Sequence, residues 1–222
     1  MCKMDGHIDW EEIISLYNTI KSLYALCEET DSELNTNLQP LNEFRASLDH
    51  MMRIAGIEKT DEYKGKSAAE EATKLQCHLR RALFDICDML AINYRTKIID
   101  ALQDFTVEEI DCAIPTYYSV IRPRVEEISE KISEYRTEKR FSTIEEEETA
   151  VYDYPETIKE LQGFYKVITN AMPSLIEIRR KNASARKETE RKALVWQKIF
   201  PVVSFVIAVI VAIIGWFAPK IF

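Results

Sequence analysis

The chain has 222 residues, a formal net charge of −8 and a charged fraction of 30%, but only five glycines. The spacing of those glycines excludes GxxxxGK and GxGxxG phosphate-binding loops, and none of the three histidines belongs to an ExxH or HExxH motif. We therefore expect neither a cofactor nor a metal site.

The composition predicts an all-α fold. Leu, Ile, Ala, Glu and Lys dominate, which favours helices, and the few glycines leave little material for tight hairpin turns. We expect a cytosolic antiparallel bundle of about five long helices, followed by one C-terminal transmembrane helix. The predicted parts are an acidic cytosolic helical bundle (1–178), a basic juxtamembrane helix (179–198), a transmembrane helix (199–219) and a short tail (220–222).

The N-terminal part of the chain is expected to form two helices. Asp9 and Glu12 have capping-box spacing before a helix-period apolar stripe, which predicts a helix over about 10–30. Pro40 suits the first turn of a second helix and Gly56 its C-terminal stop. The predicted apolar face of this second helix consists of Leu41, Phe44, Leu48, Met51, Met52 and Ala55. Residues 57–66 are predicted to form a polar connection.

The middle of the chain continues this pattern. Ser67 with Glu70 predicts the start of a third helix, whose stripe runs unbroken for about 38 residues as one long helix or as two with a bend. Thr106 with Glu109 is another capping box, and Pro115 is expected to end or kink the helix it starts. A further long helix should reach about residue 139. Residues 141–154, which include four consecutive glutamates, are interpreted as a connection.

The last soluble helix is predicted to start at Asp153 and Pro155 and to bend at Pro173. No strong stop signal follows. The helix therefore either continues through the basic segment into the membrane or has a hinge near residues 182–184, and the sequence leaves both possibilities open.

The 21 residues from Ile199 to Pro219 carry no charge. As a helix they would extend about 31 Å, which matches the hydrocarbon core of a bilayer. Lys198 and Lys220 flank the segment, and Trp196 and Trp216 lie near its ends, where the headgroup layer favours such side chains. We predict a single membrane span.

Charge is distributed unevenly about this span. Residues 179–222 carry nine Lys and Arg against two Glu, a net of +7, so residues 1–178 carry −15. Eight cations precede the span and are expected to contact anionic lipid headgroups: Arg179, Arg180, Lys181, Arg186, Lys187, Arg191, Lys192 and Lys198. By the positive-inside rule, the N-terminal domain should face the cytoplasm from the cell membrane. An RNA-binding arm is the competing interpretation of these cations.

The span contains a stripe of small residues. Ser204, Ala208, Ala212 and Gly215 follow one another at spacings of four, four and three, which places them on one helix face. Such stripes allow close approach of transmembrane helices, so we predict a homo-oligomer that packs through these residues. A plain lipid-solvated anchor is the alternative.

Arg45 and His50, in the segment LNEFRASLDH, are the candidate catalytic residues. Their spacing resembles the Arg-x4-6-His motif of HEPN ribonucleases, which are helical domains that bring two such pairs together on dimerisation. The resemblance implies metal-independent RNA cleavage, with Arg45 holding the scissile phosphate and His50 transferring a proton. The sequence departs from that motif at Ala46, where active members usually have a polar residue. Alternatively, His50 lies at the edge of the core and Arg45 is exposed.

These sequence patterns support two functional hypotheses. The first is a C-terminally anchored helical interaction or effector protein that self-associates and perturbs the membrane on assembly, with a protein partner that the sequence does not identify. The second is a membrane-tethered HEPN-like ribonuclease or a degenerate relative. The net charge of −15 on residues 1–178 argues against a nucleic-acid surface, because binding to phosphates depends on clustered cations.

Overall fold

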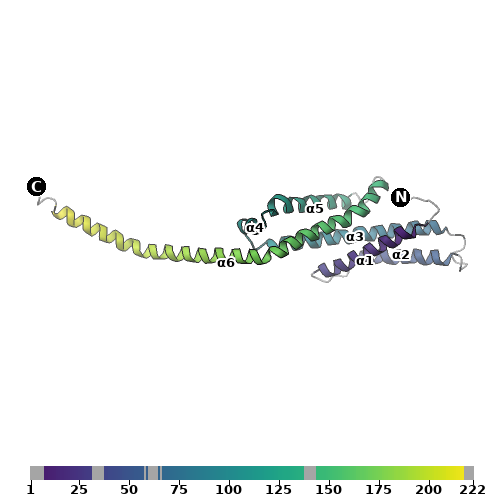
Figure 1. Cartoon of the computed structure of the whole chain (residues 1–222), viewed down its shortest axis with the longest axis horizontal. Coiled ribbons are helices and arrows are strands. Elements are labelled where there is room, and N and C mark those ends of the chain that lie inside the picture. The colour runs from purple at the N-terminus through teal and green to yellow at the C-terminus, as the bar shows by residue number, and fades with distance from the viewer. Residues whose placement is uncertain are drawn as a thin grey trace.

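The computed structural model describes residues 8–31, 38–57, 59, 65, 67–137 and 144–217; side chains are described over the same residues except 135–137, 144–148 and 213–217. Within these ranges the regular structure is entirely helical, which confirms the predicted all-α class. The helices are α1 (Trp10–Thr30), α2 (Leu38–Gly56), α3 (Ala68–Leu102), α4 (Val107–Ala113), the π-helical turn η2 (Tyr117–Ile121), α5 (Arg122–Thr137) and α6 (Ile144–Phe217) (Figure 1).

Three helix starts follow the predicted caps. The Asp9 carboxylate accepts a hydrogen bond from the Glu12 amide at 3.0 Å. Ser67 caps α3 through the amide of Glu70, and Thr106 and Glu109 form both bonds of a capping box. Each cap satisfies amide groups that the first helical turn would otherwise leave without a partner.

Helix α3 is the centre of the helical body, by which we mean the described residues between 8 and 178. It is one helix of 35 residues, and α1, α2 and α6 all pack against it (Figure 1). Leu83, Ile86 and Leu90 of α3 are fully buried. From α6, Ile158, Leu161, Ile168 and Leu175 complete this core. A single truncation of such a buried leucine to alanine typically costs about 2–5 kcal/mol, so the first part of α6 is an integral element of the body.

The predicted connection over residues 141–154 is wrong from residue 144 onward, because α6 begins at Ile144. Ala150 and Tyr154 are buried, and the Tyr154 hydroxyl donates a hydrogen bond to Asp88 of α3. The run of glutamates lies in the first two turns of α6, where the positive end of the helix dipole favours carboxylates. Residues 141–143 lie outside the described residues.

The predicted apolar face of α2 meets the core only through Phe44, which is partly buried against it. Leu41, Leu48, Met51 and Met52 are exposed, whereas Pro40, Ser47 and His50 are the buried side chains of this helix. The Ser47 hydroxyl donates to the carbonyl of Phe44, and His50 bonds to a carboxylate of α3, so the buried face is polar but satisfied. Apart from Phe44, the apolar face is left open to solvent.

The region around Pro115 follows the prediction in outline. Helix α4 ends at Ala113, and the chain resumes at Tyr117 as a π-helical turn that leads directly into α5. Helix α5 extends to Thr137, and residues 138–140 lie outside the described residues.

Helix α6 is continuous over 74 residues and contains Pro155, Pro173 and Pro201. It passes through residues 182–184 without a break and extends far beyond the helical body as an isolated, gently curved helix (Figure 1). Of the two possibilities left open by the sequence, the structure shows continuity. The apolar segment and the core of the body therefore belong to the same helix.

Candidate functional site

Arg45 and His50 lie on different faces of α2. Five residues on a helix correspond to a rotation of about 140°. Accordingly, Arg45 is exposed while His50 is buried against α3. The structure of one chain does not bring the two side chains together, and their use in RNA cleavage stays a prediction.

His50 instead forms a pair with His78 of α3. The two imidazole rings are stacked, with centroids 5.3 Å apart and planes at 21°. Nδ1 of His50 lies 2.7 Å from Glu71, and Nδ1 of His78 lies 2.6 Å from Glu43. Because an ionised carboxylate only accepts hydrogen bonds, Nδ1 is the donor in each pair. Glu43 and Glu71 were not predicted, because their partners lie 35 and 21 residues away and no local pattern marks such contacts.

Glu71 is the most enclosed charge in this group. Its side chain is 5% exposed, and it accepts hydrogen bonds from His50 and from Lys74, the latter at 2.9 Å, while Arg53 lies at 3.5 Å. Burial alone would raise the pKa of Glu71, but the bonds from His50 and Lys74 outweigh burial and lower the pKa from 4.5 to about 2. The polar cluster thus ties the C-terminal half of α2 to the start of α3.

The Glu71 contacts predict an acid-sensitive contribution to stability. A carboxyl group whose pKa is depressed on folding stabilises the folded state above its unfolded pKa, and this contribution is lost as the pH falls from about 4.5 toward 2. We expect Glu71→Gln to lower the free energy of unfolding by about 2 kcal/mol at pH 6, the usual size of a hydrogen bond to a charged group. The difference from the wild type should vanish near pH 2 in urea denaturation.

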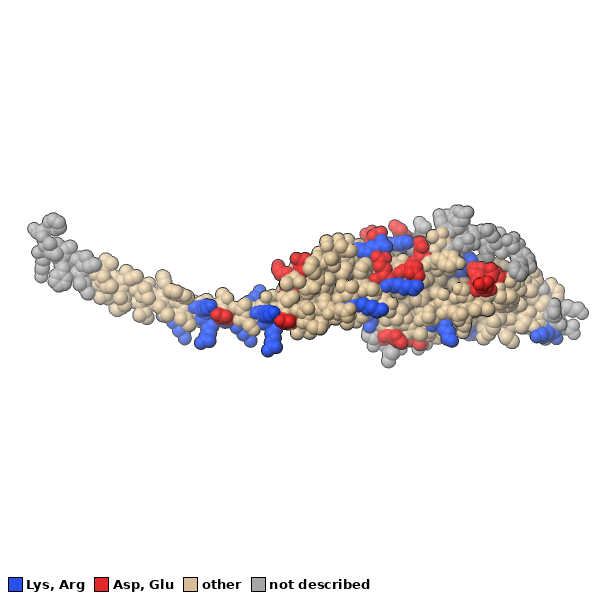
Figure 2. Space-filling view, viewed as in Figure 1, with Lys and Arg blue, Asp and Glu red and all other residues tan. Residues whose placement is uncertain are grey.

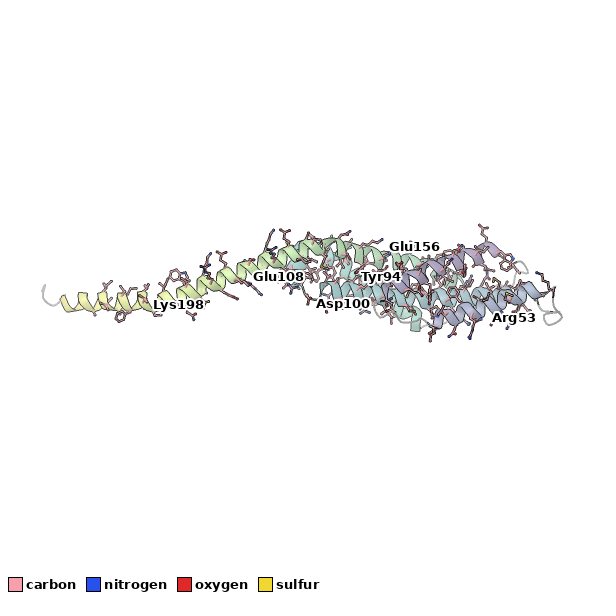
Figure 3. All side chains as sticks on the ribbon, turned by 90° about the horizontal axis from the view of Figure 1, so that it is seen from below. Arg53, Tyr94, Asp100, Glu108, Glu156 and Lys198 are labelled. Carbon is pink, nitrogen blue, oxygen red and sulfur yellow. The ribbon has the colours of Figure 1, made fainter. Side chains whose placement is uncertain are left out.

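Glu156→Gln is the matched control, because Glu156 makes one ion pair and is 68% exposed (labelled in Figure 3). It should change stability by well under 1 kcal/mol at both pH values. A Glu71→Gln effect that is the same at pH 6 and pH 2 would contradict the role given to the Glu71 charge.

The paired histidines do not form an evident metal centre. Over the part of the chain that the structure describes, no group of three or more His, Cys, Asp and Glu side chains is placed to hold a metal ion. No disulfide joins Cys27, Cys77, Cys87 and Cys112, the four cysteines in that part.

A second polar contact lies where α6 leaves the helical body, close to Glu108 (Figure 3). The Asn182 amide donates to Glu109 of α4 at 3.2 Å, and Glu109 also accepts from the backbone of Thr106. Arg179 lies over the Phe105 ring, 5.5 Å from its centroid. The beginning of the basic segment is therefore held against α4.

The eight predicted headgroup-binding cations are all exposed on α6. Most of them lie on the part of α6 that has left the body. Figure 2 shows blue side chains with a few red ones on this part, followed by a stretch without charge. Two form pairs along the helix, Lys181 with Glu177 at 2.7 Å and Lys192 with Glu188 at 2.8 Å. Lys198 marks the boundary with the apolar stretch (Figure 3).

The apolar end of α6 has no partner within the chain. Among the described residues, α6 holds the one segment that is long and apolar enough to cross a membrane, and none of that segment is buried. Ser204, Ala208 and Ala212 are exposed on it. Gly215 belongs to α6 but lies beyond the residues whose side-chain surroundings are described.

Comparisons with protein-family models, curated proteins and solved structures gave no match for the chain. Its function must therefore be inferred from its own sequence and geometry.

Proposed function

We propose that the protein is a single-pass, C-terminally anchored interaction or effector protein whose helical bundle lies on the cytoplasmic face of the cell membrane. The observation that carries this proposal is the continuity of α6. One helix contributes buried side chains to the body, then presents the basic segment, and then supplies the apolar segment. Such a helix transmits position and tilt between the body and a bilayer.

The exposure of the apolar segment supports insertion rather than burial. Val202, Phe205, Ile207 and Val211 are each more than half exposed, and a soluble helix of this composition would need a covering partner. The adjoining cations would then lie at the headgroup layer, where each Lys or Arg contributes about 1 kcal/mol of attraction to anionic lipid. Their position before the segment favours a cytoplasmic body.

Self-association through the span is the second part of the proposal. The stripe of Ser204, Ala208, Ala212 and Gly215 offers close helix approach, and a chain with one span can meet only another chain there. Assembly of several such helices is the proposed route by which the protein perturbs the membrane.

Enlarging one stripe residue should weaken the assembly. We expect Ala208→Leu to raise the dissociation constant at least tenfold, about 1.4 kcal/mol, because the larger side chain holds the helix backbones apart. Crosslinking in lipid vesicles measures this change. Val209→Leu, which alters the adjacent helix face, should leave the crosslinked fraction unchanged. A wild-type protein that stays monomeric at all protein-to-lipid ratios would contradict self-association.

The HEPN-like ribonuclease remains the alternative. The exposed Arg45 and the buried His50 give it no additional support, because a shared site would require a second chain to approach a histidine that already contacts Glu71. We therefore propose the anchored interaction protein alone.

A further inference from the structure

An open apolar groove runs along the helical body between α1 and α2. Both helices pack along α3, and they meet each other where the Phe44 ring packs edge-on against Tyr17 and Tyr24, with centroids 6.3 Å apart in each pair. The groove over this contact has a volume of about 660 Å³. Buried Leu75 and Leu79 of α3 form part of its floor. The proposed function uses none of these residues.

The two walls of the groove repeat with the same period. On α1, Trp10, Ile14, Tyr17, Lys21 and Tyr24 line the groove at spacings of four, three, four and three residues. On α2, Leu41, Phe44, Leu48 and Met51 line it at spacings of three, four and three. Ile13 and Ser47 also line the groove, but both are buried and lie deeper than the walls. Alternating spacings of three and four are those of a coiled-coil seam, in which side chains of a further helix insert between those of the walls.

The dimensions also suit a helix. The α1 wall from Trp10 to Tyr24 has 15 residues and rises about 21 Å, or roughly four helical turns. The walls are accessible: Trp10, Ile14, Tyr17, Leu48 and Met51 are all more than 40% exposed. Exposed apolar patches of this kind on a folded domain usually mark an interaction surface.

The charge of the lining identifies the chemistry of the occupant. Lys21 is the one charged residue among the described residues that line the groove, and no carboxylate lies among them. A helix that fills the groove would enclose the Lys21 ammonium in a largely apolar contact. A carboxylate on that helix would compensate for the lost solvation.

A second copy of the chain is a poor occupant. This step rests on the proposed function, because copies anchored in one membrane through continuous α6 helices hold their bodies side by side and at the same height. Two grooves that met in this way would place two Lys21 side chains at one level of an apolar interface without a carboxylate from either lining. We infer that the groove between α1 and α2 binds an amphipathic α-helix of another protein, with apolar residues at alternating spacings of three and four and a carboxylate opposite Lys21.

The position of the groove fits such a partner. Helices α1 and α2 lie in the part of the body farther from the exposed end of α6 (Figure 1), and Arg53 at the end of α2 lies far from Lys198 (Figure 3). The groove is therefore open to a helix presented from the side of the membrane that the body occupies.

The test uses the full chain in lipid nanodiscs and fluorescent 18-residue helical peptides. Each peptide carries leucine at seam spacing, with one glutamate placed at each of the central seam positions in turn, and empty nanodiscs correct for binding to lipid. We expect at least one glutamate peptide to bind with a micromolar dissociation constant, measured by fluorescence anisotropy. Replacing its glutamate with lysine should weaken binding at least tenfold.

Matched protein variants locate the peptide. Leu48 on the groove wall and Ile92 on α3 outside the lining are both 50% exposed. Leu48→Glu should weaken peptide binding at least tenfold, whereas Ile92→Glu should leave it unchanged. Lys21→Glu should reverse the preference, so that the lysine peptide binds better than the glutamate peptide.

Three results would overturn the inference: no glutamate peptide binds above the empty nanodiscs, binding persists in Leu48→Glu, or Leu48→Glu reduces only the oligomer size of the protein. A fourth result would also overturn it: displacement of a bound peptide by a stoichiometric amount of free fatty acid would show that the groove binds an acyl chain. The same protein, prepared without nanodiscs, is also tested for flotation with vesicles, which reports on membrane anchoring alone. A groove that binds no peptide is therefore distinguished from a protein that does not insert into membranes.

Discussion

Replacing Val206 and Ile210 with arginine is expected to release the protein from membranes. Both residues lie near the middle of the uncharged segment and are about half exposed, without contacts to the helical body. An arginine at the centre of a membrane span costs about 3 kcal/mol on insertion scales, so two cost about 6 kcal/mol. This exceeds the expected effect of every other substitution considered, and the body should keep its stability.

Flotation with vesicles followed by alkaline carbonate extraction measures the release. Carbonate removes proteins held only by the eight cations of the basic segment, so retention reports insertion. The matched variant Val206→Leu with Ile210→Leu should remain resistant to extraction. Carbonate-resistant binding of the double arginine variant would show that α6 does not insert in the proposed way.

The sequence predicted local features of the fold well. The caps at Asp9, Ser67 and Thr106 depend on side chains within three residues of the amides that they satisfy, so their spacing is sufficient. The unbroken apolar stripe also predicted the extent of α3, but it left open one helix or two with a bend, and the structure shows one. These predictions required no knowledge of which helices pack together.

Long-range pairing was not predictable in the same way. Periodicity identified the apolar face of α2 but could not show that α3 would mainly meet the neighbouring face, where His50 reaches Glu71 across 21 residues of sequence. The apolar face that remained open became the α2 wall of the groove. A single sequence records a hydrophobic face, whereas the partner for that face depends on the packing of the other helices.

The start of α6 was missed for an electrostatic reason. Four consecutive glutamates suggest a solvated loop when they are considered as a charge run, yet the same residues at a helix N-terminus interact favourably with the helix dipole. The same four glutamates therefore predict either a loop or a helix N-terminus, depending on where the helix begins. That boundary is fixed by distant contacts, including the burial of Tyr154 beside Asp88.

Helix α6 is continuous through its exposed part, where a substitution can alter it without touching the helical body. Ala185 is exposed, three residues after the Asn182 contact with Glu109, and nothing but its own helix supports it. Proline at this position removes one backbone hydrogen bond and clashes with the preceding turn, at a cost of about 3 kcal/mol. Because α6 already contains Pro155, Pro173 and Pro201 without a break, we expect Ala185→Pro to kink α6 between the body and the apolar segment rather than to break it, without loosening the anchor.

Spin labels at Ser174 and Gln197, introduced after replacement of the accessible native cysteines, measure this kink. The labelled positions are 23 residues apart, about 35 Å along a continuous helix. The wild type should give one narrow distance distribution near that length, and Ala185→Gln should reproduce it. Ala185→Pro should give a shorter and broader distribution.

If the body acts on the membrane through the tilt of α6, Ala185→Pro should abolish vesicle leakage on assembly while membrane retention persists. Leakage that survives the proline would mean that α6 tethers the body without transmitting its orientation.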